Sequence, residues 1–119
     1  MDSTQRQAVF RGSLQKAIQT NEEIVIFEDP ASGKFVQFAV SAPEKNLIVD
    51  VPLDNLTKQE YDWLGQHMEI MTDSKGEPLS FQKLISTIQV DYAVNYTEWI
   101  FTKIFQLPKG FSVTAQVFT

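Results

Sequence analysis

Residues Glu23 to Val51 decide the fold, with the sequence EIVIFEDPASGKFVQFAVSAPEKNLIVDV. Three runs rich in β-branched and aromatic residues, 24–27, 35–40 and 47–51, are separated by segments that contain Pro, Gly, Asn or Asp. β-Branched and aromatic side chains favour a pleated strand, whereas the other residues interrupt it where the chain reverses. The stretch therefore predicts a meander of three strands with alternating side chains.

Helical patterns flank this meander. Asp2, Ser3 and Thr4 can each cap a helix that ends near residues 20–21, because apolar residues follow at helical spacing: Phe10, Leu14, Ala17 and Ile18. Thr57 and Glu60 have the spacing of a capping box and predict a second helix. Gly65 either ends that helix as a left-handed cap or is tolerated inside it.

The second half continues the alternation of helices and strands. Residues 72–78 are polar and predict an exposed loop, and residues 79–88 favour a strand over a helix. Asp91 is expected to cap a long helix that reaches Gln106, and residues 111–118 alternate like a half-buried strand. We therefore predict one α+β domain over residues 1–119, in the order α-β-β-β-α-β-α-β. Its antiparallel sheet should be covered on its apolar face by the first and last helices.

Composition narrows the class of protein. The 119 residues are 43% hydrophobic and 21% charged and lack Cys, which predicts a single globular domain and a reducing, cytoplasmic environment. The first residues do not resemble a secretory signal, and no apolar run is long enough to span a membrane. A membrane is therefore not an expected partner, and nucleic acid is not expected either, because the net charge of -5 repels a phosphate backbone.

The last helix carries more apolar surface than one sheet requires. Its polar residues form a stripe about 80° wide, which leaves an apolar arc of roughly 240° where ~100° is enough. Either the helix lies between the sheet and other helices of its own domain, or one flank binds a second protein, most simply another copy of the chain. In the second case Tyr92 and Tyr96 would face the sheet, and the interface anchors would be Trp99, Phe101, Phe105 and Val94.

Residues with recognisable site chemistry are few. His67 is the only histidine, so pairs of histidine ligands and a Ser-His-Asp triad are disfavoured, and no catalytic, metal or cofactor site is expected. Gly33-Lys34 lacks the rest of a phosphate loop and indicates an ordinary turn. The alternative is a small-molecule or enzymatic cleft beside the meander, built from the carboxylates Glu28, Asp50 and Asp54.

The order of elements resembles the type III secretion chaperone-like proteins, particularly the group with the Tir chaperones and YbjN. The similarity covers most of the chain and rests on short segments: Lys34-Phe35-Val36-Gln37-Phe38, Tyr61-Asp62-Trp63-Leu64-Gly65, and Trp99 to Phe105 followed by Leu107-Pro108. The resemblance implies a small, acidic, cytoplasmic protein that binds another protein and often dimerises. A strand after the long helix departs from the secretion chaperones and favours a relative with another role. We therefore expect a non-enzymatic, chaperone- or adaptor-like interaction module that self-associates.

Overall fold

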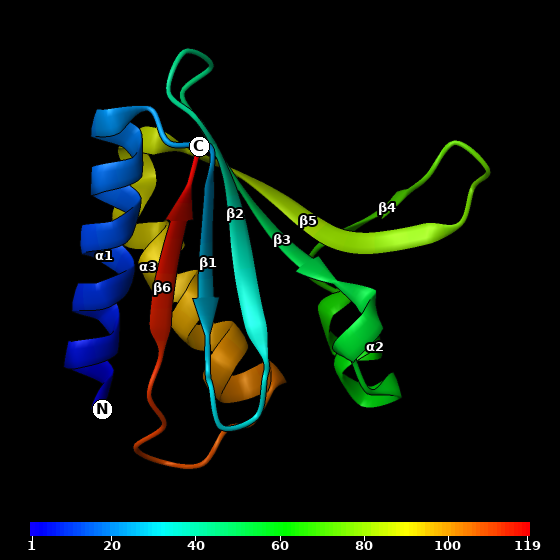
Figure 1. The fold of residues 1–119 in the computed structure, drawn as a ribbon. Helices are drawn as coiled ribbons and strands as arrows, with labels where there is room; N and C mark the ends of the chain where they lie inside the picture. The colour runs from blue at the N-terminus through cyan, green and yellow to red at the C-terminus, as the bar shows by residue number, and fades with distance from the viewer.

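The predicted meander forms the centre of a six-stranded sheet in the computed structural model, which describes residues 1–119. All neighbouring strands are antiparallel, in the order β4-β5-β3-β2-β1-β6 (Figure 1). The strands are β1 (Ile24–Glu28), β2 (Phe35–Ser41), β3 (Asn46–Pro52), β4 (Glu69–Thr72), β5 (Pro78–Ser86) and β6 (Thr114–Phe118). The predicted α+β class and antiparallel sheet are confirmed.

Three α-helices and three shorter helical turns accompany the sheet. They are α1 (Ser3–Thr20), α2 (Lys58–Leu64), α3 (Val90–Trp99), the π-helical turn η3 (Ile100–Ile104) that continues α3, and the short 3-10 turns η1 (Leu53–Asn55) and η2 (Thr87–Gln89). Asp2 caps α1, and Thr57 forms the predicted capping box with Glu60. Gly65 ends α2 in a right-handed conformation (φ -62°), so of the two alternatives left open by the sequence the left-handed cap is wrong.

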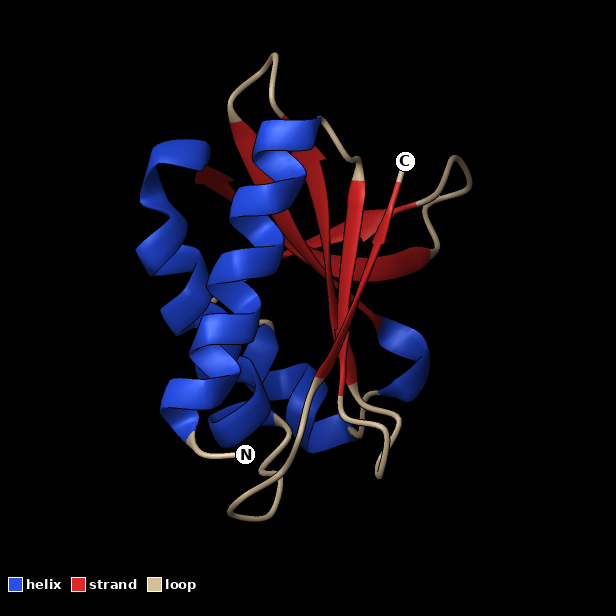
Figure 2. Cartoon of the chain, turned by 60° about the vertical axis from the view of Figure 1, so that its left-hand side comes forward, coloured by secondary structure: helices blue, strands red, loops and turns tan.

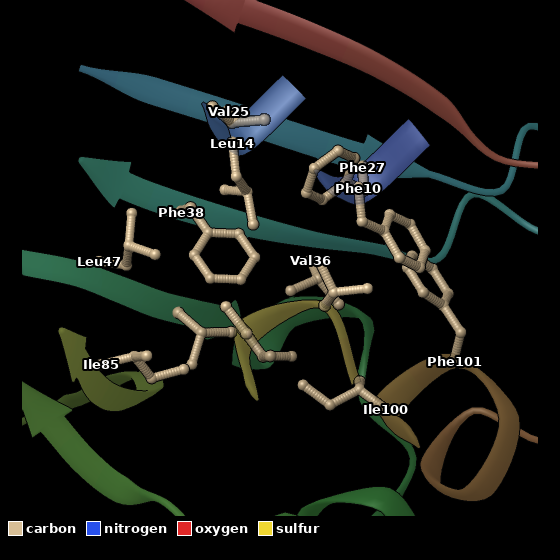
Figure 3. Packing of buried hydrophobic residues seen from close by; sticks show 14 of the residues in the cluster. Phe10, Leu14, Val25, Phe27, Val36, Phe38, Leu47, Ile85, Ile100 and Phe101 are labelled. Carbon is tan, nitrogen blue, oxygen red and sulfur yellow. The ribbon is translucent and has the colours of Figure 1, made fainter. Parts of the chain in front are cut away.

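One hydrophobic core lies between the sheet and the long helices (Figures 2 and 3). Alternate residues of the central strands, such as Val25 and Phe27 in β1, point into it and are fully buried. The Phe10 ring of α1 packs edge-on against Phe27 at 4.8 Å and stacks with Phe101 of η3 at 6.0 Å. The first and last helices thus cover the apolar face, as the strand alternation predicts.

The segment 69–86 is a β-hairpin that projects from the body of the protein (Figure 1). β5 confirms the predicted strand, whereas the sequence analysis missed β4, because all four of its residues are exposed and leave no alternating pattern. The exposed loop predicted for residues 72–78 contains the turn between them. There the Asp73 carboxylate accepts hydrogen bonds from the backbone N–H groups of Lys75 and Glu77.

Asp91 does not cap the last helix. That helix follows directly from η2, where the Ser86 hydroxyl accepts a hydrogen bond from the Ile88 N–H, and Gln89 at the start of α3 makes no side-chain cap. Asp91 lies inside the first turn and pairs with Arg11 of α1 at 2.8 Å. The helical path continues through η3 to Phe105, and Gln106 leaves it in the left-handed region (φ 52°).

Candidate interaction surface

One face of the sheet has no helix over it. The buried residues of the meander point toward α1 and α3, and their neighbours in sequence point the other way and are only half-buried. Figure 1 looks onto this second face of β6, β1 and β2, with α3 behind them, and Figure 2 shows both long helices on one side. We call this second face the open face.

An apolar row crosses the open face. The strand register places five apolar residues side by side on consecutive strands, one each from β6, β1, β2, β3 and β5: Phe118, Ile24, Ala39, Ile48 and Leu84. The two ends of the row are the most accessible, with Phe118 45% and Leu84 64% exposed. We call these five residues the apolar row.

A depression lies at the β5 end of the apolar row. Its volume is about 510 Å³, and Ile48, Leu84 and Met71 form its apolar walls. Gln82, Glu69 and His67 add polar groups to the lining, and Lys83 also lines it. The Lys83 ammonium itself lies 5.6 Å from the ring centre of Tyr96, on the helix side of the sheet. The hollow is therefore apolar at its walls and carries a carboxylate from β4.

Asp50 anchors a polar row next to the apolar row. Its carboxylate accepts hydrogen bonds from Gln37 Nε2 at 2.9 Å, Gln82 Nε2 at 2.7 Å and Ser80 Oγ at 2.9 Å. Asp50 is only 9% exposed, and these three neutral donors, from β2 and β5, replace the water it loses. The network fixes the side chains on the open face and ties three strands together.

The candidate carboxylates of the alternative site do not converge. Glu28 pairs with Phe35 in the register, whereas Asp50 pairs with Gln37, so β2 separates the two acids and they lie in different cross-strand rows. Asp54 lies exposed in η1. None of the three lines the 510 Å³ depression, and no group of three or more His, Cys, Asp or Glu residues is placed to hold a metal ion.

Three of the four predicted interface anchors on the last helix lie in the core. Val94 and Phe101 are fully buried, Phe105 is 8% exposed, and all three belong to the core of a single chain. Phe101 packs against Phe105 and Phe111 and stacks on Phe10, so the flank expected to meet a neighbour faces α1 and the sheet. Trp99 alone of the four keeps partial exposure.

The accessible flank of the last helix carries an aromatic chain instead. Tyr92, Tyr96 and Trp99 follow one another at ring distances of 5.8 and 5.3 Å, and His67 packs edge-on against Trp99 at 4.8 Å. The Tyr96 hydroxyl is buried without a hydrogen-bond partner in the protein. Burial, followed by the nearby Tyr92, raises the pKa of Tyr96 to about 12. It therefore stays a neutral phenol at physiological pH and is unsuited to accept a proton.

Two ion pairs with low exposure escaped the sequence analysis. Arg6 Nη2 lies 2.6 Å from Glu98 Oε1, with the two side chains 7% and 11% exposed, and the guanidinium also lies over the Phe111 ring. Lys34 Nζ lies 2.8 Å from Glu60 Oε1 and also donates to the Asn55 carbonyl. Both pairs join segments distant in sequence, so no local pattern predicts them. The first pair links α1 to α3, and the second links the β1–β2 turn to α2.

In comparisons with known proteins no family model matches the chain, and neither a curated protein nor a solved structure matches it. No helix has the length and hydrophobicity to cross a membrane.

Proposed function

We propose that this protein is a non-enzymatic interaction module, chaperone- or adaptor-like, which binds a segment of another protein on the open face. The observation that carries the proposal is the apolar row, five side chains wide, on a sheet face that no helix of the chain covers. A contiguous apolar surface that stays exposed lowers the solubility of a protein unless a partner covers it. The lack of Cys and the acidic charge support a cytoplasmic setting.

The rigidity of the surface supports the same proposal. Four of the five residues of the apolar row lie on inner strands of the sheet, Phe118 lies on the edge strand β6, and the hydrogen-bonded Asp50 network lies beside the row. A preorganised surface binds without the entropic cost of ordering side chains and loops. The resemblance to secretion chaperone-like proteins points to the same class of function.

Site-specific photo-cross-linking in the native cells tests the proposal. A photoreactive phenylalanine analogue at Leu84 should form a discrete cross-link to another protein. The same analogue at Ile88, which is 88% exposed but lies in η2 outside the apolar row, serves as the matched control. Equal, diffuse cross-linking from both positions contradicts the proposal, and a small molecule retained on the purified chain in native mass spectrometry favours a ligand-binding domain.

Self-association is the second part of the proposal, and it uses the projecting hairpin instead of the last helix. Ile70 of β4 and Leu79 of β5 are 41% and 54% exposed, and Tyr61 of α2, which contacts Phe81, is 39% exposed. Ile70 pairs with Phe81, which points away from the apolar row, so Ile70 and Tyr61 lie on that side of the hairpin, and Leu79 lies next to them at the β-bulge opposite Met71 and Thr72. Two hairpins packed about a two-fold axis would bury these side chains reciprocally, and the open faces would remain free.

A further inference from the structure

We propose that the open face accepts an amphipathic helix whose polar flanks carry Lys or Arg. This inference rests on the proposed function and adds the chemistry of the partner. The outward positions of the six strands include three carboxylates, Glu28, Asp50 and Glu69, and no Lys or Arg. The charged side chains at these outward positions are therefore all acidic, and Lys83, which also lines the depression, places its ammonium 5.6 Å from the Tyr96 ring on the helix side. Complementary potential across an interface orients the two partners.

The same charge distribution disfavours a second copy as the occupant. Two open faces packed together would bring their carboxylates into one interface without any cation to pair them. Like charges placed together across an interface oppose binding. The net charge of -5 on the chain adds to this repulsion at long range. A cationic partner removes both obstacles.

The hydrogen bonding of the sheet favours a helical partner over an extended one. β3, β2 and β1 have a neighbour on both sides, and β5 pairs with β3 over Ser80–Ser86 and with β4 over residues 78–82, so the ladders already use most of the backbone groups beneath the apolar row. An extended segment lying on such a face would leave its own N–H and C=O groups without partners against the apolar row. A helix satisfies those groups internally and presents only side chains.

The dimensions of the apolar row set the length of the helix. Five strands span four inter-strand spacings of about 4.8 Å, or roughly 19 Å. At ~1.5 Å per residue this corresponds to about 13 residues, enough for three or four apolar anchors on one face. One anchor can enter the 510 Å³ depression beside Leu84, where Glu69 is placed to meet a flanking cation. The row, the hollow and the carboxylate together describe one binding site.

Fluorescence anisotropy with a designed helix of about 14 residues tests the inference. The probe has leucine on one face and lysine on the other, and two comparison peptides replace lysine with glutamine or glutamate. The lysine peptide should bind with one-to-one stoichiometry and more tightly than either comparison peptide. Its affinity should fall about tenfold in Leu84→Gln and in Ile24→Gln and stay unchanged in Ile88→Gln, since only the first two lose buried apolar contact. A lysine peptide interrupted by proline should bind poorly.

A second pair of variants separates local from overall charge. Glu69→Gln removes a carboxylate at the depression, and Asp62→Asn removes one from the exposed surface of α2. The preference for lysine over glutamine should shrink more in the first variant. If Glu69→Gln and Asp62→Asn reduce the preference equally, or if Leu84→Gln leaves the affinity unchanged, the peptide is attracted to the acidic chain as a whole. Either result overturns the inference.

The remaining outcomes separate this inference from the proposed function. If all three peptides bind equally well and Leu84→Gln weakens each of them, the open face is an interaction surface without a charge preference, and only the inference falls. If no peptide binds but the chain dimerises through Leu84, the occupant is a second copy and the inference is overturned. If no peptide binds and no dimer forms, the inference is again overturned, and the cross-linking yield at Leu84 decides the proposed function independently.

Discussion

Removal of the Glu98 carboxylate should destabilise the fold far more than removal of its exposed counterpart on the same pair of helices. Arg6 Nε lies 3.0 and 3.1 Å from the two Glu98 oxygens, and Nη2 lies 2.6 Å from one of them. The remaining nitrogen, Nη1, donates to the backbone carbonyls of Met1 and Phe111. Glu98→Ala therefore strips the partners from two of the three nitrogens of a buried guanidinium.

The size of the effect follows from burial. Hydrogen bonds to charged groups contribute about 1.5–3 kcal/mol each. Breaking a buried pair by removing one partner costs about 3–5 kcal/mol, because it leaves an unpaired charge. In the matched control, Asp91→Ala, the side chains of Arg11 and Asp91 are 40% and 83% exposed, so water replaces the lost contact and the cost stays below about 0.5 kcal/mol.

Urea unfolding at neutral pH measures both free energies of unfolding, with circular dichroism as the signal. The double variant Arg6→Met/Glu98→Leu should recover most of the loss, because apolar replacement of a buried ion pair is often neutral or stabilising. A cost below about 1 kcal/mol for Glu98→Ala, or equal costs for Glu98→Ala and Asp91→Ala, would falsify the reasoning.

Three further predictions concern the core, the aromatic chain and the hairpin. Phe101→Ala should lower the free energy of unfolding by about 3–5 kcal/mol. An unchanged urea midpoint together with a changed oligomeric state would mean that Phe101 lies in an interface and not in the core. The free energy of unfolding of the wild type should fall as pH rises from 10 to about 12, because Tyr96 ionises in the unfolded chain before it ionises in the fold. Tyr96→Phe should weaken this fall in urea titrations at alkaline pH. The same variant should leave the stability at neutral pH unchanged or higher, because it removes a buried hydroxyl without a partner. In light scattering, Leu79→Gln should dissociate any dimer that the wild type and Ile88→Gln both form, and a dimer that survives Leu79→Gln excludes the hairpin as its interface.

Local chemistry explains which parts of the fold could be predicted. The meander, the Asp2 cap and the Thr57–Glu60 box depend on residues a few positions apart, so their spacing is visible in the sequence. The Arg6–Glu98 pair joins residues 92 positions apart, and Asp50 takes donors from two other strands. No periodicity encodes such contacts, because they depend on how the elements pack.

The error on the last helix has the same origin. Periodicity established that the apolar arc was too wide for one sheet, but it cannot say which flank faces inward. In the structure Phe101 faces the core and stacks on Phe10 of α1, whereas Tyr92 is 46% exposed. Two residues of the predicted polar stripe, Glu98 and Asp91, also form ion pairs with arginines of α1. Contacts with the first helix thus absorb much of the surplus that suggested a dimer.

The strands themselves contain a signal for the open face. A strand with one face in water alternates between apolar and polar residues, whereas a strand covered on both faces is a nearly continuous apolar run. Residues 24–27, Ile-Val-Ile-Phe, and 47–49, Leu-Ile-Val, are continuous runs in β1 and β3. The chain supplies helices for only one face of these strands. Their composition therefore suits a sheet with two covering layers, and it is the one local signal in the sequence that agrees with the proposed binding of a partner on the open face.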